Sequence, residues 1–258
     1  MLKSIITSFF ICLILVFTTG TLQAQTPKNI YYDNLVWTQY VLKAQVAKKW
    51  SLHFDMGYRT HDYLKEKAQY FFRPAVNYQL SSNVVLQAGY AHFSTSQFIN
   101  GYQDIMRPED RLYQRVTVTQ KSGRFEFRNR YRLEERFIQN FKNGALQEGT
   151  TFSTRLSYQI YVSCAINKPK ITDKTWYVFA FDELFVSFGK TIYNNFDQNR
   201  LAAGLGYQFG KGINATIFYQ YIYGQQATGT QIYIYNSYGI TLSQALDFRK
   251  KKPSNTTK

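Results

Sequence analysis

The sequence is poor in cysteine and histidine, and these shortages exclude several kinds of site. Of its 258 residues, two are cysteine and three are histidine. Only Cys164 would remain after removal of a leader that contains Cys12, so no internal disulfide is expected. No pair of cysteines or histidines stands at metal-ligand spacing, and no glycine-rich phosphate loop is present. The sequence therefore predicts no metal site and no bound cofactor.

The chain also lacks a long apolar run beyond its first residues. Residues 1–24 have the pattern of a secretory signal peptide, with Lys3 as its basic start, residues 5–17 as its apolar core and a cut ahead of Gln25. The alternative is a membrane-anchoring helix, but this core is too short to cross a bilayer comfortably. No later window reaches the roughly 18 apolar residues of a transmembrane helix. We therefore expect an exported protein without transmembrane helices.

Acidic residues are scarce, whereas aromatic and basic residues are abundant. Lysine and arginine number 31 against 16 aspartates and glutamates, which gives a net charge of +15. Aromatic residues make up 18% of the chain, with 22 tyrosines and 21 phenylalanines. Such an aromatic share fits the girdles that flank the apolar band of a membrane barrel.

The clearest pattern lies in residues 124–136. Every second residue there is charged, and most of the residues between are aromatic or aliphatic. A period of two indicates an extended strand with one face toward water and the other toward lipid. The charged positions are Arg124, Glu126, Arg128, Arg130, Arg132, Glu134 and Arg136.

Similar alternation recurs in about eleven segments, each about ten to fourteen residues long. A tilted strand needs about 9 to 11 residues to cross the hydrocarbon layer, whereas soluble strands average about five or six. We therefore predict an all-β fold, a closed antiparallel transmembrane β-barrel of about 12 strands (range 10–12). No repeat or linker divides the chain, so residues 25–248 form one barrel domain and residues 249–258 a basic, disordered tail.

The connections predict short periplasmic turns and longer external loops. Residues 95–110, 139–149 and 190–195 are expected to form the long loops. Eleven segments pose a difficulty, because two chain ends in the periplasm require an even number of crossings. Residues 28–34 could supply a short first strand, the N-terminus could thread the lumen, or the count could be off by one. Residues 175–188 are apolar on both faces, which predicts a bulge there.

Several motifs are spread over nearly all of the chain beyond the leader. They are Trp50-Ser51-Leu52, Gly57-Tyr58-Arg59, Arg73-Pro74, Arg128-Asn129-Arg130-Tyr131-Arg132-Leu133-Glu134-Glu135-Arg136, Asp182-Glu183-Leu184-Phe185, Phe196-Asp197-Gln198-Asn199-Arg200 and Gly204-Leu205-Gly206-Tyr207. In these motifs the chain resembles an uncharacterised outer-membrane family, domain of unknown function 2490. The resemblance implies an outer-membrane barrel and brings no known activity or catalytic residues.

The alternation assigns a set of arginines and glutamates to the lumen. The predicted lumen-lining residues are Arg59, Arg73, Arg115, Glu126, Arg128, Arg130, Arg132, Glu134, Arg136, Glu183 and Arg200. Arginine keeps its charge and pairs with carboxylates at two points. The first interpretation is a narrow channel or binding barrel for small anionic or polar solutes. The alternative is a non-conducting structural or interaction barrel whose lumen is plugged by ion pairs.

A third interpretation is a surface lipid-modifying enzyme. His92 shares a strand face with Ser94 and Ser96, but such pairs often arise by chance, so we predict that the protein is not an enzyme. Nucleic-acid binding is not expected, because the aromatic residues are predicted on the face opposite the arginines. The expected partners are outer-membrane lipid and a small anionic solute, and the expected state is a monomer. Gly204 and Gly206 are expected to allow strand curvature or to leave room for inward arginines.

Overall fold

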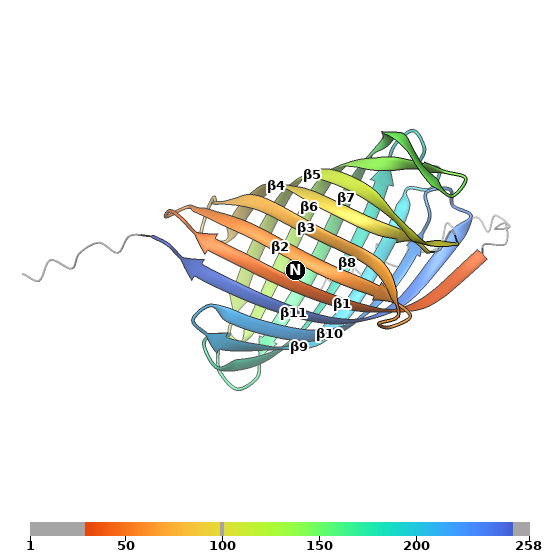
Figure 1. The fold of residues 1–258 in the computed structure, drawn as a ribbon. Coiled ribbons are helices and arrows are strands. Elements are labelled where there is room, and N and C mark those ends of the chain that lie inside the picture. The colour runs from red at the N-terminus through yellow and green to blue at the C-terminus, as the bar shows by residue number, and fades with distance from the viewer. Residues whose placement is uncertain (1–28, 99–100, 250–258) are drawn as a thin grey trace, which may run out of the picture.

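The computed structural model describes residues 29–98 and 101–249 and folds them into one barrel of β-strands (Figure 1). The strands are β1 (Asn29–Gln45), β2 (Trp50–His61), β3 (Glu66–Gln79), β4 (Val84–Gln97), β5 (Tyr102–Ser122), β6 (Phe125–Lys142), β7 (Ala145–Ala165), β8 (Thr175–Phe188), β9 (Phe196–Gly210), β10 (Ile213–Gln225) and β11 (Gln231–Asp247). Within the described residues no helix is long and apolar enough to cross a membrane. The predicted leader, 1–24, and tail residues 250–258 lie outside the described residues.

Each strand pairs antiparallel with its sequence neighbour, and the barrel closes where β1 pairs with β11. This closing pair is parallel, in register from Asn29 opposite Gln231 to Gln45 opposite Asp247. The predicted closed barrel is confirmed, and eleven described strands fall within the predicted range. The favoured even number is not observed in this part of the chain. Of residues 28–34, considered as a separate short strand, the described part, 29–34, is instead the first part of β1.

The two ends of the barrel both carry short and longer connections. We call the end where β11 finishes the tail end, and the end where β6 turns into β7 the hairpin end. Two of the predicted long loops are largely strand: β5 already begins at Tyr102, and β6 and β7 are joined by Asn143 and Gly144 alone, with φ of 51° and 75°. Polar side chains suit an exposed hairpin as well as a loop. The sequence pattern of these stretches therefore did not distinguish the two.

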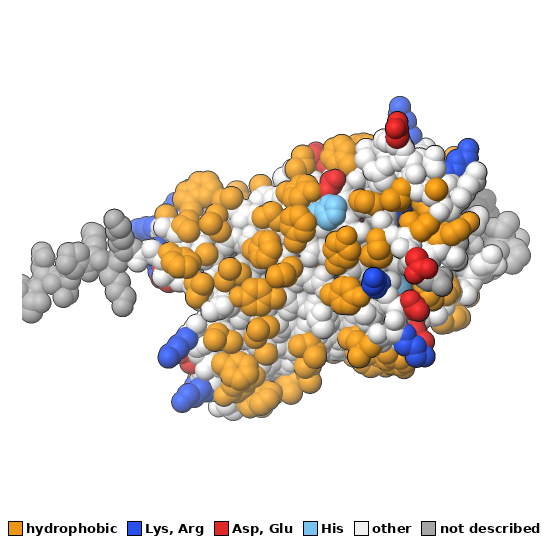
Figure 2. Space-filling model, in the orientation of Figure 1, with side chains coloured by type: hydrophobic (Ala, Val, Ile, Leu, Met, Phe, Trp, Pro, Cys, Tyr) orange, Lys and Arg blue, Asp and Glu red, His pale blue; other side chains and the backbone are white. Residues whose placement is uncertain are grey.

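The outer wall carries the apolar side chains that the alternation assigned to lipid. Among the exposed large residues are Leu52, Met56, Tyr58, Tyr70, Phe72, Val76, Leu112, Val116, Leu156, Tyr158 and Ile160. Figure 2 shows hydrophobic side chains spread over the visible wall, with charged side chains gathered toward its two ends. An apolar band between charged rims is the surface that a lipid bilayer requires. Closure also leaves no strand edge unpaired, which matters because lipid offers no hydrogen-bond partners.

The inner wall contains aromatic rings that the sequence analysis placed outside. Trp37, Phe71, Phe93 and Phe185 face inward among the arginines, so the prediction that aromatics and arginines lie on opposite faces is wrong in part. In β8 the apolar character of both faces arises because its inward positions are also aromatic. A register shift does occur in β8, between Phe185 and Val186.

Inward glycines make room for these rings rather than for arginines. A Cβ at Gly206 would collide with the Tyr177 ring, and one at Gly239 would collide with the Phe218 ring. Aromatic rings packed over glycine shield the strand backbone that a missing side chain leaves bare. The expectation that Gly204 and Gly206 accommodate arginines is therefore corrected, since the nearest side chains to Gly204 are Phe179 and Phe218.

Candidate functional site

Nine inward side chains form a closed circuit of contacts around the lumen, which we call the ring. Its members come from β1 to β9, one from each strand, because the tilt of the strands brings these positions to one level. In order of contact they are Trp37, Arg59, Phe71, Phe93, Arg111, Glu134, Arg155, Phe185 and Arg200. Arg200 completes the circuit by lying 5.3 Å from the Trp37 ring centre.

The ring joins its members by two kinds of contact. Arginines lie over aromatic faces, as with Arg59 over Trp37 at 3.6 Å and Arg111 over Phe93 at 3.7 Å. Glu134 supplies the ion pairs, at 2.7 Å to Arg155 and 3.3 Å to Arg111. Cation–π contacts are worth about 0.5–2 kcal/mol each and fix the guanidinium planes without neutralising them. The ring therefore holds four arginines against one carboxylate.

On the hairpin side of the ring, acids and arginines are matched. Glu109 pairs with Arg111 at 2.6 Å and also with Arg136, while Asp197 lies 3.5 Å from Arg136 and 3.4 Å from Arg155. The side chains of Glu109 and Arg136 are only 8% and 14% exposed. Buried pairs of this kind are stable only when each charge is compensated, and here each carboxylate contacts two guanidinium groups.

An apolar cluster fills the other part of the hairpin side. Leu35, Ile222 and Tyr235 are buried there, and Tyr31 and Tyr233 pack against them. At its edge the His61 ring hydrogen bonds to Asp33 and stacks on Phe98. On the hairpin side, this cluster therefore confines the open space of the lumen to the wall opposite the cluster.

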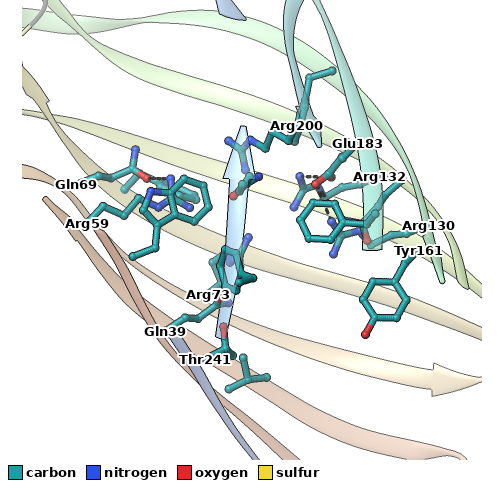
Figure 3. Close-up of a pocket in the computed structure, with 18 of the residues that line it drawn as sticks. Gln39, Arg59, Gln69, Arg73, Arg130, Arg132, Tyr161, Glu183, Arg200 and Thr241 are labelled. Carbon is teal, nitrogen blue, oxygen red and sulfur yellow. Dashed lines mark hydrogen bonds and ion pairs between the residues drawn. The ribbon is translucent and has the colours of Figure 1, made fainter. Parts of the chain in front are cut away.

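A cavity of about 770 Å³ runs along the lumen (Figure 3). Its lining includes Gly212 and Ala245 near the tail end, seven members of the ring, and Gln97 and Arg107 near the hairpin end. Because seven of the nine ring members line it and its lining continues on both sides of the ring, the cavity passes through the ring. Eleven basic and three acidic side chains contribute to the lining.

On the tail side of the ring, arginines exceed the acids available to them. Arg130 and Arg132 share Glu183, at 2.9 Å and 3.2 Å. Arg73 holds Asp55 at two points, 2.6 Å and 3.0 Å. Figure 3 shows these arginines pointing with Arg59 and Arg200 toward the same open space from different strands.

Some of these arginines have only neutral partners or none. Arg59 donates to Gln69 Oε1 at 2.5 Å, and Arg200 donates to Gln198 Oε1 at 2.9 Å. Arg115 makes no ion pair within the described residues, and its buried Nε has no hydrogen-bond partner. Arg59 and Arg200 line the cavity, and an uncompensated guanidinium beside a water-accessible space attracts anions, because its positive charge is only partly solvated.

The structure places the predicted lumen residues as follows. Those on the cavity wall are Arg59, Arg73, Arg128, Arg130, Arg132, Arg136, Glu183 and Arg200. Glu134 faces inward but is buried behind its arginines, and Glu126 faces inward near the tail end, 3.5 Å from Arg128. Arg115 faces inward beside Arg132, which is opposite it in register.

Sequence reasoning missed two carboxylates and the aromatic members of the ring. Glu109 lies within a segment predicted to be a loop, and Asp197 stands in a family motif without an assigned side of the wall. The pattern around Trp37 and Phe185 indicates only a lipid face or an irregular strand. A strict period of two would place Asp197 on the face opposite Arg200, and only the register shift at this point of β9 brings it to the lumen, so no sequence signal could have indicated it.

The outer wall carries the only histidine considered for catalysis. His92 faces outward, with Nδ1 at 2.8 Å from Asp110, and the Tyr90 hydroxyl also donates to Asp110. Ser94 is buried, and no hydrogen bond joins it to His92 among the described residues. In residues 29–98 and 101–249 no group of three or more metal-ligating side chains occurs.

Comparison with known proteins identifies a family for the chain, whereas its similarity to solved structures is low. The family model described as "Protein of unknown function (DUF2490)" matches residues 34–233. No curated protein matches the chain. The β domain of the Bordetella autotransporter BrkA is 12% identical with a TM-score of 0.46, covering 73% of this chain and 80% of its own.

Two further solved barrels show weaker similarity. LpxR from Salmonella typhimurium is 10% identical with a TM-score of 0.41, over 75% of this chain and 83% of its own. The siderophore receptor PirA from Pseudomonas aeruginosa is 9% identical with a TM-score of 0.31, over 70% of this chain and 32% of its own. These values are too low to carry an argument about what this chain does.

Proposed function

Since the chain belongs to the DUF2490 family, which has no described function, we propose from the geometry that it is a narrow outer-membrane channel for small anionic solutes. The observation that carries the proposal is the cavity that passes through the ring. Arg59, Arg111, Arg155 and Arg200 surround it there, and Glu134 is the single acid of the ring. A ring of fixed cations selects anions at a constriction.

The outer wall and the predicted signal peptide support an outer-membrane location. An apolar band between charged rims fits a bilayer, and the predicted signal peptide would deliver the chain to the periplasm. In this proposal the tail end faces the periplasm and the hairpin end faces outward, since β5, β6 and β7 are the longest strands and they reach the β6–β7 turn at the hairpin end. The closed wall offers no free strand edge for a second copy, which supports a monomer.

Solute uptake by proteoliposomes tests the proposal. Succinate and its neutral analogue succinamide are similar in size, so a charge-selecting lumen should admit succinate faster. We expect that Arg200→Glu, which reverses charge in the ring where its hydrogen-bond partner is neutral, abolishes the difference. Equal entry of both solutes, or of neither, would reject the channel.

A second candidate function is a closed structural or interaction barrel. The observation in its favour is that the ring is continuous, with Phe185 at 0% and Glu134 at 2% exposure. If the long arginine side chains fill the remaining gap, the barrel would not conduct and its hairpin end would serve a partner. Electrically silent bilayers that contain correctly folded barrel would favour this candidate.

A further inference from the structure

The ring leaves two strands unrepresented, and polar groups without partners gather there. The contact between Arg200 on β9 and Trp37 on β1 bridges β10 and β11. Gln220 and Ser237 stand on these two strands directly opposite each other in register. Gln220 is 1% exposed and Ser237 is 0% exposed.

Four polar atoms at this place have no hydrogen-bond partner within the described residues. They are Gln220 Oε1, Ser237 Oγ, Trp37 Nε1 and Arg59 Nε. Buried polar atoms are nearly always paired, and each unpaired one costs about 1–3 kcal/mol. Four of them on neighbouring strands, with three of the four residues lining the cavity, indicate a place built to receive something.

The chemistry of these atoms defines the ligand. Trp37 Nε1 and Arg59 Nε are donors and require an acceptor, which a carboxylate provides. Gln220 Oε1 requires a donor, and Ser237 can serve either way. An ammonium group as that donor is disfavoured, because eleven basic side chains line the cavity. A hydroxyl group meets the need without charge, and it both donates and accepts.

We infer that the wall between β9 and β2 is a binding subsite for hydroxylated carboxylates, the class of hydroxy acids and sugar acids. The carboxylate lies against Arg59 and Trp37, and a neighbouring hydroxyl group pairs with Gln220 and Ser237. This inference rests on the proposed function, because the ligand reaches the subsite through the lumen. It adds a preference among anions that charge alone does not give.

Trp37 supplies a local reporter for the test. The other two tryptophans of the chain, Trp50 and Trp176, are 48% and 46% exposed on the outer wall. Replacing both by phenylalanine leaves Trp37 as the single source of tryptophan fluorescence. The full-length barrel in detergent is then titrated with succinate and with tartrate, which is succinate carrying two hydroxyl groups. Both probes have the same charge and chain length.

We expect tartrate to bind about tenfold more tightly than succinate, the effect of one or two newly satisfied polar atoms. Gln220→Leu should remove this preference by weakening tartrate binding to the level of succinate binding. Its matched control is Gln208→Leu, because Gln208 also lines the cavity but already bonds Ile213 O at 3.0 Å. Should Gln220→Leu fail to fold, Ser237→Ala provides the same comparison.

The outcomes separate this inference from the proposed function. Succinate binding with no tartrate preference, or a preference that persists in both Gln220→Leu and Ser237→Ala, overturns the hydroxyl subsite and leaves the channel intact. In that case the four atoms are satisfied by buried water alone. Absence of binding by either anion would reject the subsite together with the anion-selecting lumen.

Discussion

The lumen on the hairpin side of the ring and the lumen on its tail side use the same residue types to opposite effect. On the hairpin side, Glu109 and Asp197 each contact two arginines, and the rest is filled by an apolar cluster. On the tail side, Arg130 and Arg132 share Glu183, with Glu134 farther away at 3.7 Å from Arg132, and Arg115 has no ion pair in the described structure. Matched charges close space, whereas unmatched ones need water or an anion.

Exposure along single strands follows the same division. In β1, Leu35 on the hairpin side is 4% exposed, whereas Lys43 on the tail side also faces inward and is exposed. In β10, Ile222 is buried and Thr216 is half-buried. Small inward residues do not by themselves open the tail side, since the Tyr113 ring packs against Gly89, and Ala75 is buried in the same apolar cluster as Tyr113. The difference shows that charge balance and side-chain volume together decide where a barrel stays open.

The largest expected effect is the loss of a matched charge. Glu134→Gln removes the carboxylate that Arg111 and Arg155 share. It leaves them only Glu109 and Asp197, which both also pair with Arg136, so the free energy of unfolding should fall by about 3 kcal/mol. Glu126→Gln, on the tail side with a side chain 24% exposed, should cost about 1 kcal/mol or less. Denaturant unfolding of barrels refolded into lipid vesicles measures both. Equal losses would erase the distinction between the two sides.

Overpacking substitutions should show a smaller difference in stability between the two sides of the ring. Ser153 is 1% exposed, and a Cβ added at Gly189 would lie only 3.2 Å from its Cβ, so Ser153→Leu should destabilise the barrel by about 1–3 kcal/mol. Thr241→Leu places the same side chain beside the tail-side cavity and should change stability by about 0.5 kcal/mol or less. Its conductance should drop instead. Comparable destabilisation by the two leucines would mean that the tail side is as tightly packed as the hairpin side.

Removing an unmatched arginine should affect selectivity more than stability. Arg115→Gln takes away a charge without an ion pair, so the unfolding free energy should change by about 1 kcal/mol or less. The preference for chloride over potassium should fall about twofold to fivefold, since one of several cations is lost. Arg115→Lys serves as the control that keeps the charge. A marked loss of stability in Arg115→Gln would show that this residue has a compensating partner after all.

Salt should produce the smallest effect, and only on one side. Raising salt from about 0.1 M to about 1 M shortens the Debye length from about 10 Å to about 3 Å, so succinate binding in the water-accessible cavity should weaken several-fold. The stability difference between the wild type and Glu134→Gln should stay nearly constant, because that pair is shielded from solvent. If salt abolished that difference, the ion pairs of Glu134 in the ring would have to be open to water.

The sequence alone predicted the strands and the direction of their side chains, but it did not predict how neighbouring strands are offset along the barrel axis. The period of two placed Arg130 and Glu134 inside and Leu156 outside, as the structure has them, because side-chain direction depends only on local geometry. Contacts such as Arg200 with Trp37 depend on the tilt of the whole barrel and on the parallel closure of β1 with β11. The alternation within one strand predicts neither the tilt nor the closure. The ring, and the fact that β10 and β11 contribute no member to it, are therefore apparent only in the three-dimensional structure.

The sign of ion selectivity tests the central claim most directly. The barrel is reconstituted into a planar bilayer under a potassium chloride gradient, and the reversal potential is measured for the wild type and for Arg59→Glu. Passage through a ring of four arginines and one glutamate predicts an anion-selective conductance whose preference falls or reverses in the variant. A cation-selective conductance, or a selectivity unchanged by Arg59→Glu, would contradict the account.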